Sequence, residues 1–423
     1  MGGYMVKQQL RLDSLEAFTR SLGITEPVTT TPHPFQAAPR IPSAFLSAAV
    51  GLVGVGRVLP LQARRDVAAL CNVPLDLAHV VLNRIHRLDA WPRVWMEEGD
   101  RQAGLAAGHE RAGNLSAAWE AWCTALACQR MATFADGVLL PVPSPDERWR
   151  IYNRLRHSHG HIARLEGRPV HELKIPGPVE KIPAIFHLPG EGVRRAPTLV
   201  LVHGLSGYKE FKDHQALALR DAGFATLALD MPAHGERFFG SRLRPDSETD
   251  CMAALDWLST QPEVDPERLG LLGGSMGGYW VLRTAAADDR VRACVALAAP
   301  YAMGRSGSVR QVPRNRKRPR KQGVPFLLLE FARVMGSTDP EVLENLAQQF
   351  TLEGVAASIQ CSLFLGYGTR DAIVPFSECW RLAREVQAED LTIHPYVGAG
   401  HEVAGPGPEH LPPILEWLEE RLL

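Results

Sequence analysis

The stretch LGLLGGSMGGYW, residues 269–280, places one serine among glycines directly after an apolar run. Gly273, Ser275 and Gly277 have the G-x-S-x-G spacing of a nucleophile elbow, a sharp strand-to-helix turn that presents a serine hydroxyl. Such a turn strains the backbone at the serine, and the neighbouring residues must lack bulk so that the chain can fold back. The stretch therefore predicts a buried strand, a serine nucleophile and a helix. Because the pattern is short, other parts of the chain have to support it.

From about residue 170 the sequence alternates between apolar strand-like runs and amphipathic helix-like runs. This alternation predicts an α/β fold, with a mostly parallel, doubly wound sheet and helices on both faces. Two runs at the start, VHELKIP (170–176) and KIPAIFHLP (181–189), predict a hairpin instead. The other predicted strands are PTLVLVHG (197–204), FATLALD (224–230), the run before Ser275, VRACVALAAP (291–300), CSLFLGYG (361–368) and LTIHPYV (391–397). In such sheets the functional residues gather at the carboxyl ends of the strands.

Three polar residues follow predicted strands in the order Ser275, Asp371 and His401. This is the chain order of the Ser-Asp-His triad in α/β-hydrolases, and it differs from the orders in chymotrypsin and subtilisin. A serine hydroxyl is a poor nucleophile until a base removes its proton, and His401 is the candidate base. Asp371 would hold the imidazole in the required tautomer. Taken singly, the aspartate could be a turn residue and the histidine a loop residue, but the order favours a catalytic triad.

The developing oxyanion needs backbone N–H donors from two places. Met276, the residue after the serine, supplies one. The loop after LVLVHG supplies the other, most plausibly through Leu205, where Gly204 lets the backbone approach the substrate. His203 precedes this loop, so a structural role is favoured over a catalytic one.

The chain is long for a single core, and its character changes once. Residues 1–40 are proline-rich and predicted to be irregular, and residues 41–168 are predicted to form a helical domain. Residues 169–423 are the predicted catalytic domain, with an insertion at 301–360 that is longer than ordinary strand connections.

Two segments of the helical part, 91–113 and 114–136, have apolar residues at helical spacing and predict a pair of antiparallel helices. They resemble one tetratricopeptide-like hairpin, but no second copy follows at a fixed period. Trp119 and Trp122 are three residues apart and are predicted to be core residues.

Composition limits the partners. The charges of 47 acidic and 46 basic residues nearly cancel, so the net charge of the chain does not favour binding to nucleic acid or to an anionic membrane. The seven cysteines are scattered, which favours reduced thiols and a cytoplasmic protein. The early apolar run at 44–56 is too short and glycine-rich to span a bilayer.

The insertion divides into two parts. Residues 305–321 hold eight Arg or Lys and no acid, and a solvated loop is the default interpretation. Attraction of an anionic substrate or an acidic carrier protein is an alternative, whereas nucleic-acid binding is disfavoured because aromatic residues do not interrupt the run. Glu330 lies in the apolar second part, where it is either a salt-bridged structural acid or a substrate contact.

The run RHSHGH places His157, His159 and His161 at two-residue spacing. Ligands on a helix would be three or four apart, so only the first and third could share a face. No cysteine or acid nearby completes a set. The prediction is surface histidines and no metal site.

Five motifs together resemble one family: HGLSGYKEF (203–211), LDMPAHGE (229–236), GGSMGGYW (273–280), GTRDAIVP (368–375) and GAGHEV (398–403). They are similar in sequence and order to the capped serine hydrolases, the group that includes dihydroxypseudooxynicotine hydrolases, switch-protein-like esterases and fungal polyketide-shortening hydrolases. The resemblance covers roughly residues 95–423. It implies an N-terminal helical cap folded over the active site, no metal or organic cofactor, and cleavage of esters or of carbon–carbon bonds next to ketones. Members of the group are often dimeric, so a homodimer is one expected assembly.

The sequence thus predicts a serine hydrolase acting on a mid-sized, largely apolar small molecule. Candidate substrate contacts are Tyr208, His234 and Glu330. The helical part, whose aromatic residues include Trp91, Trp95, Trp119 and Trp122, is predicted to wall the pocket. An acyltransferase or cyclase would use the same acyl-enzyme. A prolyl-oligopeptidase-like peptidase would need a β-propeller, and a non-catalytic interaction protein is disfavoured by the complete triad.

Overall fold

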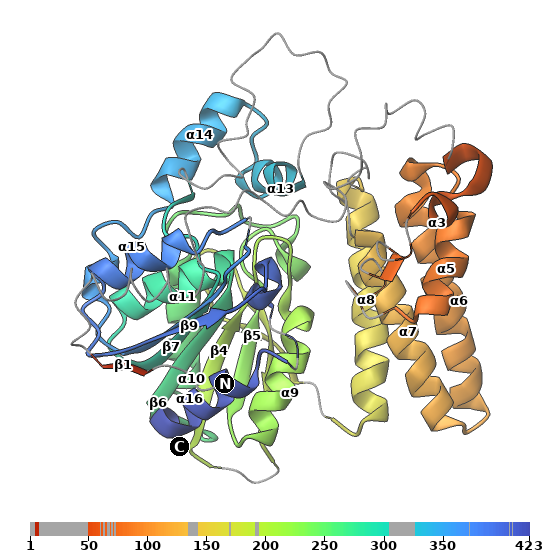
Figure 1. Cartoon of the computed structure of the whole chain (residues 1–423). Coiled ribbons are helices and arrows are strands. Elements are labelled where there is room, and N and C mark those ends of the chain that lie inside the picture. Colours follow the sequence, from red (N-terminus) through yellow and green to blue (C-terminus); the bar gives the residue numbers. More distant parts are fainter. Residues whose placement is uncertain are drawn as a thin grey trace. The chain divides into compact units, whose positions relative to one another are not determined.

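The computed structural model (Figure 1) divides into two compact units. Met1–Thr31, His171–Arg316 and Glu330–Leu423 form a sheet-containing unit, and Pro32–Val170 with Lys317–Leu329 form a helical unit. The residues that the structure describes are 5–7, 50–59, 61, 64, 65, 68, 71, 73–133, 143–168, 171–190, 194–303, 326–371, 373–405, 407 and 409–423. The basic run 305–321 and most of the segment 1–40 lie outside the described residues.

The first unit is built on a sheet whose described strands number nine, in the order β1-β9-β8-β7-β6-β4-β5-β3-β2. Neighbours from β5 through β4, β6, β7 and β8 to β9 are parallel, and the remaining pairs are antiparallel. The strands are β1 (Met5–Lys7), β2 (His171–Ile175), β3 (Ile182–His187), β4 (Ala196–Val202), β5 (Ala225–Leu229), β6 (Val264–Gly274), β7 (Val291–Leu297), β8 (Ser362–Gly368) and β9 (Asp390–Tyr396). The predicted α/β class and mostly parallel sheet are confirmed.

The two ends of the sheet are antiparallel. The predicted hairpin is present, because β2 pairs antiparallel with β3 and places Leu173 opposite Ala184. The prediction that residues 1–40 are irregular is wrong at Met5–Lys7, which pairs antiparallel with β9. A strand of three residues carries too little local pattern to be recognised, since its conformation is set by the strand beside it.

Helices cover both faces of the sheet (Figure 1). The connection from β4 to β5 through α9 (Asp213–Asp221) and the connection from β5 to β6 through α10 (Glu248–Leu258) run in opposite directions along the sheet. Because such crossovers are right-handed, the two helices lie on opposite faces. α11 (Met276–Ala287) packs with α10, whereas α16 (Pro412–Leu422) shares an apolar core with α9. The central strands are apolar on both faces for this reason, as in the fully buried β4.

The helical unit contains α3 (Val55–Val58), α5 (Leu75–Arg84), α6 (Trp91–Arg111), α7 (Leu115–Thr133) and α8 (Pro145–Leu165). The predicted antiparallel pair corresponds to α6 and α7, which are joined by a turn with Gly113 at φ 76°. Ser144 caps α8, because its hydroxyl accepts the N–H of Glu147 ahead of a proline in the first turn.

The tryptophans of this unit do not behave alike. Trp91 and Trp95 have no exposed surface and lie in its core, where the indole N–H of Trp91 donates to the carbonyl of Met131 at 2.8 Å. Their predicted role as pocket walls is therefore replaced by a structural one. Trp122 is also buried, but the prediction of a core position for Trp119 is wrong: 38% of it is exposed and its N–H donates to Glu166. An indole can lie along a helix surface when a nearby carboxylate binds its N–H.

The three clustered histidines lie on α8. His157 is exposed and shares a face with the half-buried His161, with ring centroids 4.6 Å apart, while Trp122 stacks on His161 at 4.2 Å. The prediction of a surface position is wrong for His159, which points into the unit and is only 2% exposed. The α-helical rotation of about 200° between residues two apart places alternate histidines on different faces.

The described residues of the insertion 301–360 form two α-helices, α13 (Phe326–Met335) and α14 (Pro340–Gln349), and a short 3-10 helix, η5 (Ala356–Ser358). Its two ends are held together: Met303 N–H donates to Phe350 at 2.9 Å, and Leu352 N–H donates to Tyr301 at 2.8 Å. These two hydrogen bonds, which we call the backbone clamp, hold residues 301–303 against residues 350–352.

Candidate active site

Ser275 lies between the end of β6 and the start of α11 with φ 54° and ψ −124°. A positive φ at a residue with a side chain costs roughly 1–3 kcal/mol and persists only where the surroundings impose it. Here the N–H of Ser275 donates to Leu297 of the neighbouring strand β7 at 2.8 Å, and its carbonyl accepts the N–H of Tyr279 in α11. The strand and the helix thus hold the strained residue from both sides.

The flanking glycines are required by close backbone contacts. A Cβ on Gly277 would lie 2.6 Å from the carbonyl oxygen of His203, and one on Gly273 would lie 2.5 Å from the carbonyl carbon of Gly277. No side chain fits at either position, so α11 can start directly against the end of β4. The glycine spacing in the sequence is the consequence of this packing.

The structure brings the three predicted polar residues together. His401 Nε2 lies 3.0 Å from Ser275 Oγ, and His401 Nδ1 lies 2.7 Å from Asp371 Oδ2. A carboxylate oxygen only accepts, so Nδ1 carries a proton and Nε2 is left to accept the serine O–H. Asp371 follows β8 and His401 begins the short helix η6 (His401–Ala404) after β9, so all three lie at the carboxyl edge of the sheet.

The carboxylate of Asp371 is held on both oxygens. Its Oδ1 accepts the backbone N–H groups of Ile373 and Val374, each at 2.8 Å, while Oδ2 faces the imidazole. The side chain is fully buried, whereas the side chain of His401 is 23% exposed. A buried carboxylate with three donors is fixed in position, and it fixes the orientation of the imidazole in turn.

The loop after β4 passes beside the serine. A Cβ built on Gly204 would lie 3.3 Å from the Cβ of Ser275, a tight contact that would push the two segments apart by a few tenths of an ångström. Leu205 follows directly and is buried, and Met276 begins α11 on the other side of the serine. Both residues predicted to donate oxyanion N–H groups are therefore neighbours of Ser275 in the fold.

Two buried histidines contact this loop. The N–H of Met231 donates to His203 Nε2 at 3.1 Å, and His203 Nδ1 lies 2.7 Å from the carbonyl oxygen of Gly204. His234 Nε2 lies 2.6 Å from the carbonyl oxygen of Leu205. Burial lowers the pKa of His203 to about 4 and the pKa of His234 well below its usual value. Both rings are thus neutral near pH 7.

His234 was predicted as a substrate contact, but both its ring nitrogens face backbone carbonyls. Nδ1 lies 2.8 Å from the oxygen of Pro232, Nε2 faces Leu205, and the residue is 2% exposed. The sequence does not reveal the contact with Leu205, because that carbonyl is 29 residues away in the chain.

A buried ionic cluster ties the loop after β4 to the loop after β5. Lys209 Nζ lies 2.9 Å from Glu210, 3.0 Å from Asp230 and 3.0 Å from Glu236. Asp230 also accepts the backbone N–H of Lys209 at 3.0 Å. Removing one member of such a cluster leaves uncompensated buried charge, so the cluster fixes both loops. The Lys-Glu pair in HGLSGYKEF therefore has a structural explanation.

The other two predicted substrate contacts are held by protein groups. Glu330 on α13 is fully buried, and its Oε2 lies 3.2 Å from Arg333, whose guanidinium also donates to the carbonyl of Ala233. This arrangement matches the salt-bridged alternative for the acid. The ring of Tyr208 packs on Phe211 with centroids 4.2 Å apart.

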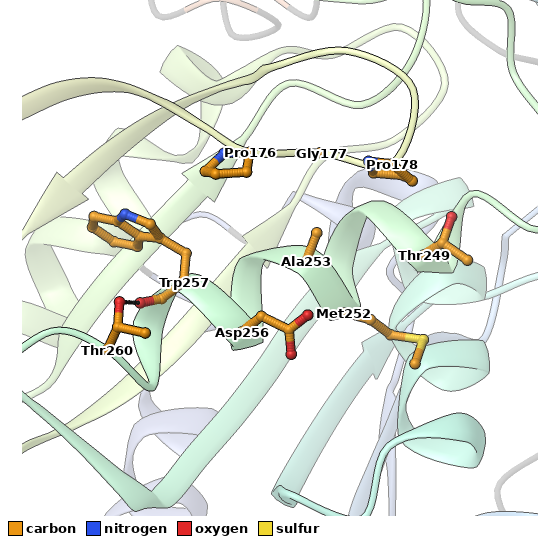
Figure 2. Close-up of a pocket in the computed structure, with 9 residues that line it drawn as sticks. All are labelled: Pro176, Gly177, Pro178, Thr249, Met252, Ala253, Asp256, Trp257 and Thr260. Carbon is orange, nitrogen blue, oxygen red and sulfur yellow. Dashed lines mark hydrogen bonds between the residues drawn. The ribbon is translucent and has the colours of Figure 1, made fainter.

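A separate groove lies between the β2–β3 turn and the outer side of α10 (Figure 2). It has a volume of about 600 Å³ and is lined by Pro176, Gly177, Pro178, Thr249, Met252, Ala253, Asp256, Trp257 and Thr260. None of the residues near Ser275 contributes to it.

Within the described part of the chain, no three His, Cys, Asp or Glu side chains are grouped as metal ligands would be. Nor is any helix in that part both long enough and apolar enough to cross a bilayer.

Sequence comparison identifies the family. Residues 199–411, just over half of the chain, match the alpha/beta hydrolase family, and the chain belongs to that family. It is 33% identical over 227 residues to "Hydrolase ORFZ" of Pyricularia oryzae, a match that covers 49% of this chain and 52% of that protein. It is 32% identical over 125 residues to "2,6-dihydropseudooxynicotine hydrolase" of Paenarthrobacter nicotinovorans, covering 30% of this chain and 33% of that protein.

These matches span about half of the curated relatives' length or less. Among solved structures, the crystal structure of the 2,6-dihydroxy-pseudo-oxynicotine hydrolase superposes with a TM-score of 0.66 at 21% identity, over 79% of this chain and 89% of that one. The similarity extends beyond the family match and shows a shared fold. The resemblance to alpha/beta hydrolases that include a dihydropseudooxynicotine hydrolase, which the sequence motifs indicated, is confirmed.

Proposed function

We propose that the chain is a serine hydrolase that cleaves an acyl bond through an acyl-enzyme on Ser275. The observation that carries this proposal is the hydrogen-bonded series from Ser275 to His401 to Asp371 at the carboxyl edge of the sheet, with distances of 3.0 and 2.7 Å. The acyl bond is that of an ester, a thioester or a ketone-adjacent carbon–carbon bond.

The geometry supports a two-stage mechanism. Ser275 Oγ attacks the acyl carbon while its proton passes to His401 Nε2, and the carbonyl electron pair moves onto oxygen. The N–H groups of Leu205 and Met276 bind this oxyanion. Collapse breaks the bond to the leaving group, which takes the proton from His401. Water then attacks the acyl-enzyme with the same base and releases the acid and Ser275.

Asp371 makes the proton transfer from Ser275 possible because it fixes the tautomer of His401. Its buried carboxylate requires a proton on Nδ1, so Nε2 is free to accept from the serine, and its charge stabilises the imidazolium that forms. Apart from the substrate and one water molecule, these steps use groups of this chain. A small-molecule substrate is supported by the relative named for 2,6-dihydropseudooxynicotine. We further propose that the substrate is mid-sized and largely apolar.

The test is labelling and kinetics on the full chain. A fluorophosphonate probe should label Ser275, and Ser275→Ala should lose both labelling and turnover of an activated ester by several orders of magnitude. Ser259→Ala is a matched control, because that hydroxyl only bonds Leu255 at the end of α10. Undiminished turnover in Ser275→Ala would rule the mechanism out.

A panel of esters and thioesters, assayed with and without added alcohols, separates hydrolysis from acyl transfer. Free acid as the sole product supports a hydrolase. A new ester that forms in preference to acid would instead assign the acyl-enzyme to an acyltransferase.

A further inference from the structure

We propose that His203 and His234 are a pair of positioning residues that set the direction of the oxyanion-binding N–H of Leu205. This inference rests on the proposed acyl-enzyme mechanism and assigns a new role within it. Neither ring contacts the serine or the base in the described structure. Both instead contact the two peptide groups on either side of the Leu205 Cα.

The first peptide group joins Gly204 to Leu205. Its carbonyl oxygen lies 2.7 Å from His203 Nδ1. A trans peptide is planar, so its N–H points opposite to its C=O. When His203 holds the carbonyl of Gly204, it thereby fixes where the N–H of Leu205 points.

The direction of donation at His203 follows from its other nitrogen. Nε2 accepts the N–H of Met231 at 3.1 Å, so it carries no proton. In a neutral ring the proton is then on Nδ1, which donates to Gly204. The ring therefore links the loop after β5, which contains Met231, to the loop after β4.

The second peptide group joins Leu205 to Ser206. Its carbonyl lies 2.6 Å from His234 Nε2, while Nδ1 of the same ring lies 2.8 Å from the carbonyl of Pro232. A neutral ring donates to one of the two at a time, and the shorter contact is the one to Leu205. With both flanking peptides held, neither backbone dihedral of Leu205 rotates freely.

The loop that carries His234 is itself anchored. Ala233 has φ 64°, and its carbonyl accepts a hydrogen bond from Arg333 at 2.7 Å. The two imidazole rings are 4.9 Å apart and only 1% and 2% exposed. Buried, neutral donors held by their own loops do not need to reorganise when charge develops on the substrate oxygen, which is what oxyanion stabilisation requires.

The test compares a carbonyl ester with its thiono analogue, in which sulfur replaces the carbonyl oxygen. Sulfur is larger and a weaker acceptor, so the ratio of kcat/KM for the oxygen ester over that for the sulfur ester reports on the oxyanion N–H groups. His203→Leu should lower kcat for the oxygen ester by about 100-fold, the effect of losing one oxyanion donor, and reduce the ratio. KM should change little.

Conservative variants provide the rescue. His203→Asn keeps a donor at the position of Nδ1 and His234→Gln keeps one at the position of Nε2, so each should restore the ratio that the corresponding leucine variant lowers. His159→Leu is the matched control, since it removes a buried histidine of the helical unit and should leave the ratio unchanged.

The outcomes are distinct. The assignment is supported if the ratio falls in a leucine variant and recovers in the corresponding Asn or Gln variant. If His203→Leu does not fold, the comparison of His234→Leu with His234→Gln provides the test. Equal losses on both esters with an unchanged ratio would overturn it and leave the histidines as ordinary packing groups. Turnover that survives Ser275→Ala would refute the proposed function instead, independently of this ratio.

Discussion

Replacing Gly274 with alanine should disable the site without changing any of its polar groups. Gly274 is the last residue of β6 and pairs with Leu297 of β7. A Cβ built on it would overlap the carbonyl oxygen of Ala404 and lie 2.5 Å from the carbonyl carbon. Ala404 ends the short helix η6 that begins with His401. The added methyl group therefore pushes against the element that carries the proposed base.

The size of the effect follows from the distances. Carbon atoms in contact normally lie about 3.5 Å apart or more, so the carbonyl carbon of Ala404 has to retreat by ~1 Å, and its overlapping oxygen has to retreat further. β6 is held by β4 and β7 on both sides, so we expect η6 to move. The Ser275–His401 distance would then approach about 4 Å, beyond hydrogen-bond range. Because general-base catalysis contributes roughly 10²–10⁴-fold, kcat/KM should fall by at least ~100-fold.

The assay is hydrolysis of a small activated ester, with thermal unfolding to show that the variant is folded. Gly104→Ala is the matched control: it lies inside α6 with nothing within 4 Å of the added Cβ. It should leave kinetics unchanged and raise stability by up to about 1 kcal/mol. A folded Gly274→Ala variant whose kcat/KM stays close to that of the unmodified chain would refute the reasoning.

Three further predictions concern buried charge and the triad. Burial lowers the pKa of Lys212 to about 7, so between pH 7 and 10.5 the unfolded chain holds a proton that the native chain lacks, and the free energy of unfolding rises with pH. Lys212→Met should remove this rise, which amounts to about 1.4 kcal/mol per pH unit. Urea unfolding of both chains at pH 7 and pH 9 measures the difference. Lys209→Met should destabilise the fold by about 3–5 kcal/mol, because it leaves buried carboxylates without their cation. Lys174→Met, which removes a largely exposed partner of the same Glu236, should cost at most about 1 kcal/mol. Similar losses of stability in chemical denaturation would contradict the stabilising role of the buried cluster. Asp371→Asn should lower kcat by several orders of magnitude with the fold intact, and full activity would show that the carboxylate is dispensable.

The parts that could be predicted from sequence are those with local physical causes. Gly273 is required by its contact with Gly277, four residues further along the chain, and the G-x-S-x-G spacing is visible for that reason. Strand ends could be recognised from apolar runs, and parallel topology places successive carboxyl ends at one edge. Asp371 and His401 could therefore be placed near the serine before any distance was known.

What could not be predicted depends on partners distant in the chain. His203 accepts the N–H of Met231, 28 residues away, and His234 faces the carbonyl of Leu205, 29 residues away. The loops that carry these groups meet only after β4 and β5 pair. Trp119 has the spacing of a core residue, yet Glu166, 47 positions away, binds its indole N–H at the surface. Met5–Lys7 is a strand because β9 lies beside it, and no pattern within three residues encodes that pairing.

The backbone clamp at the base of the insertion bears on how such a chain can evolve. Residues 301–303 and 350–352 are bonded to each other, so β7 and β8 pair in the same register whatever length of chain lies between. Loop-closure entropy grows only logarithmically, and each doubling of that length costs about 0.6 kcal/mol. The length of the insertion can thus change at little cost while Ser275 and Asp371, on either side of it in sequence, keep their spacing. Selection can act on the length of the insertion while the proposed chemistry stays constant, provided that Arg333 of α13 keeps its hydrogen bond to the carbonyl of Ala233.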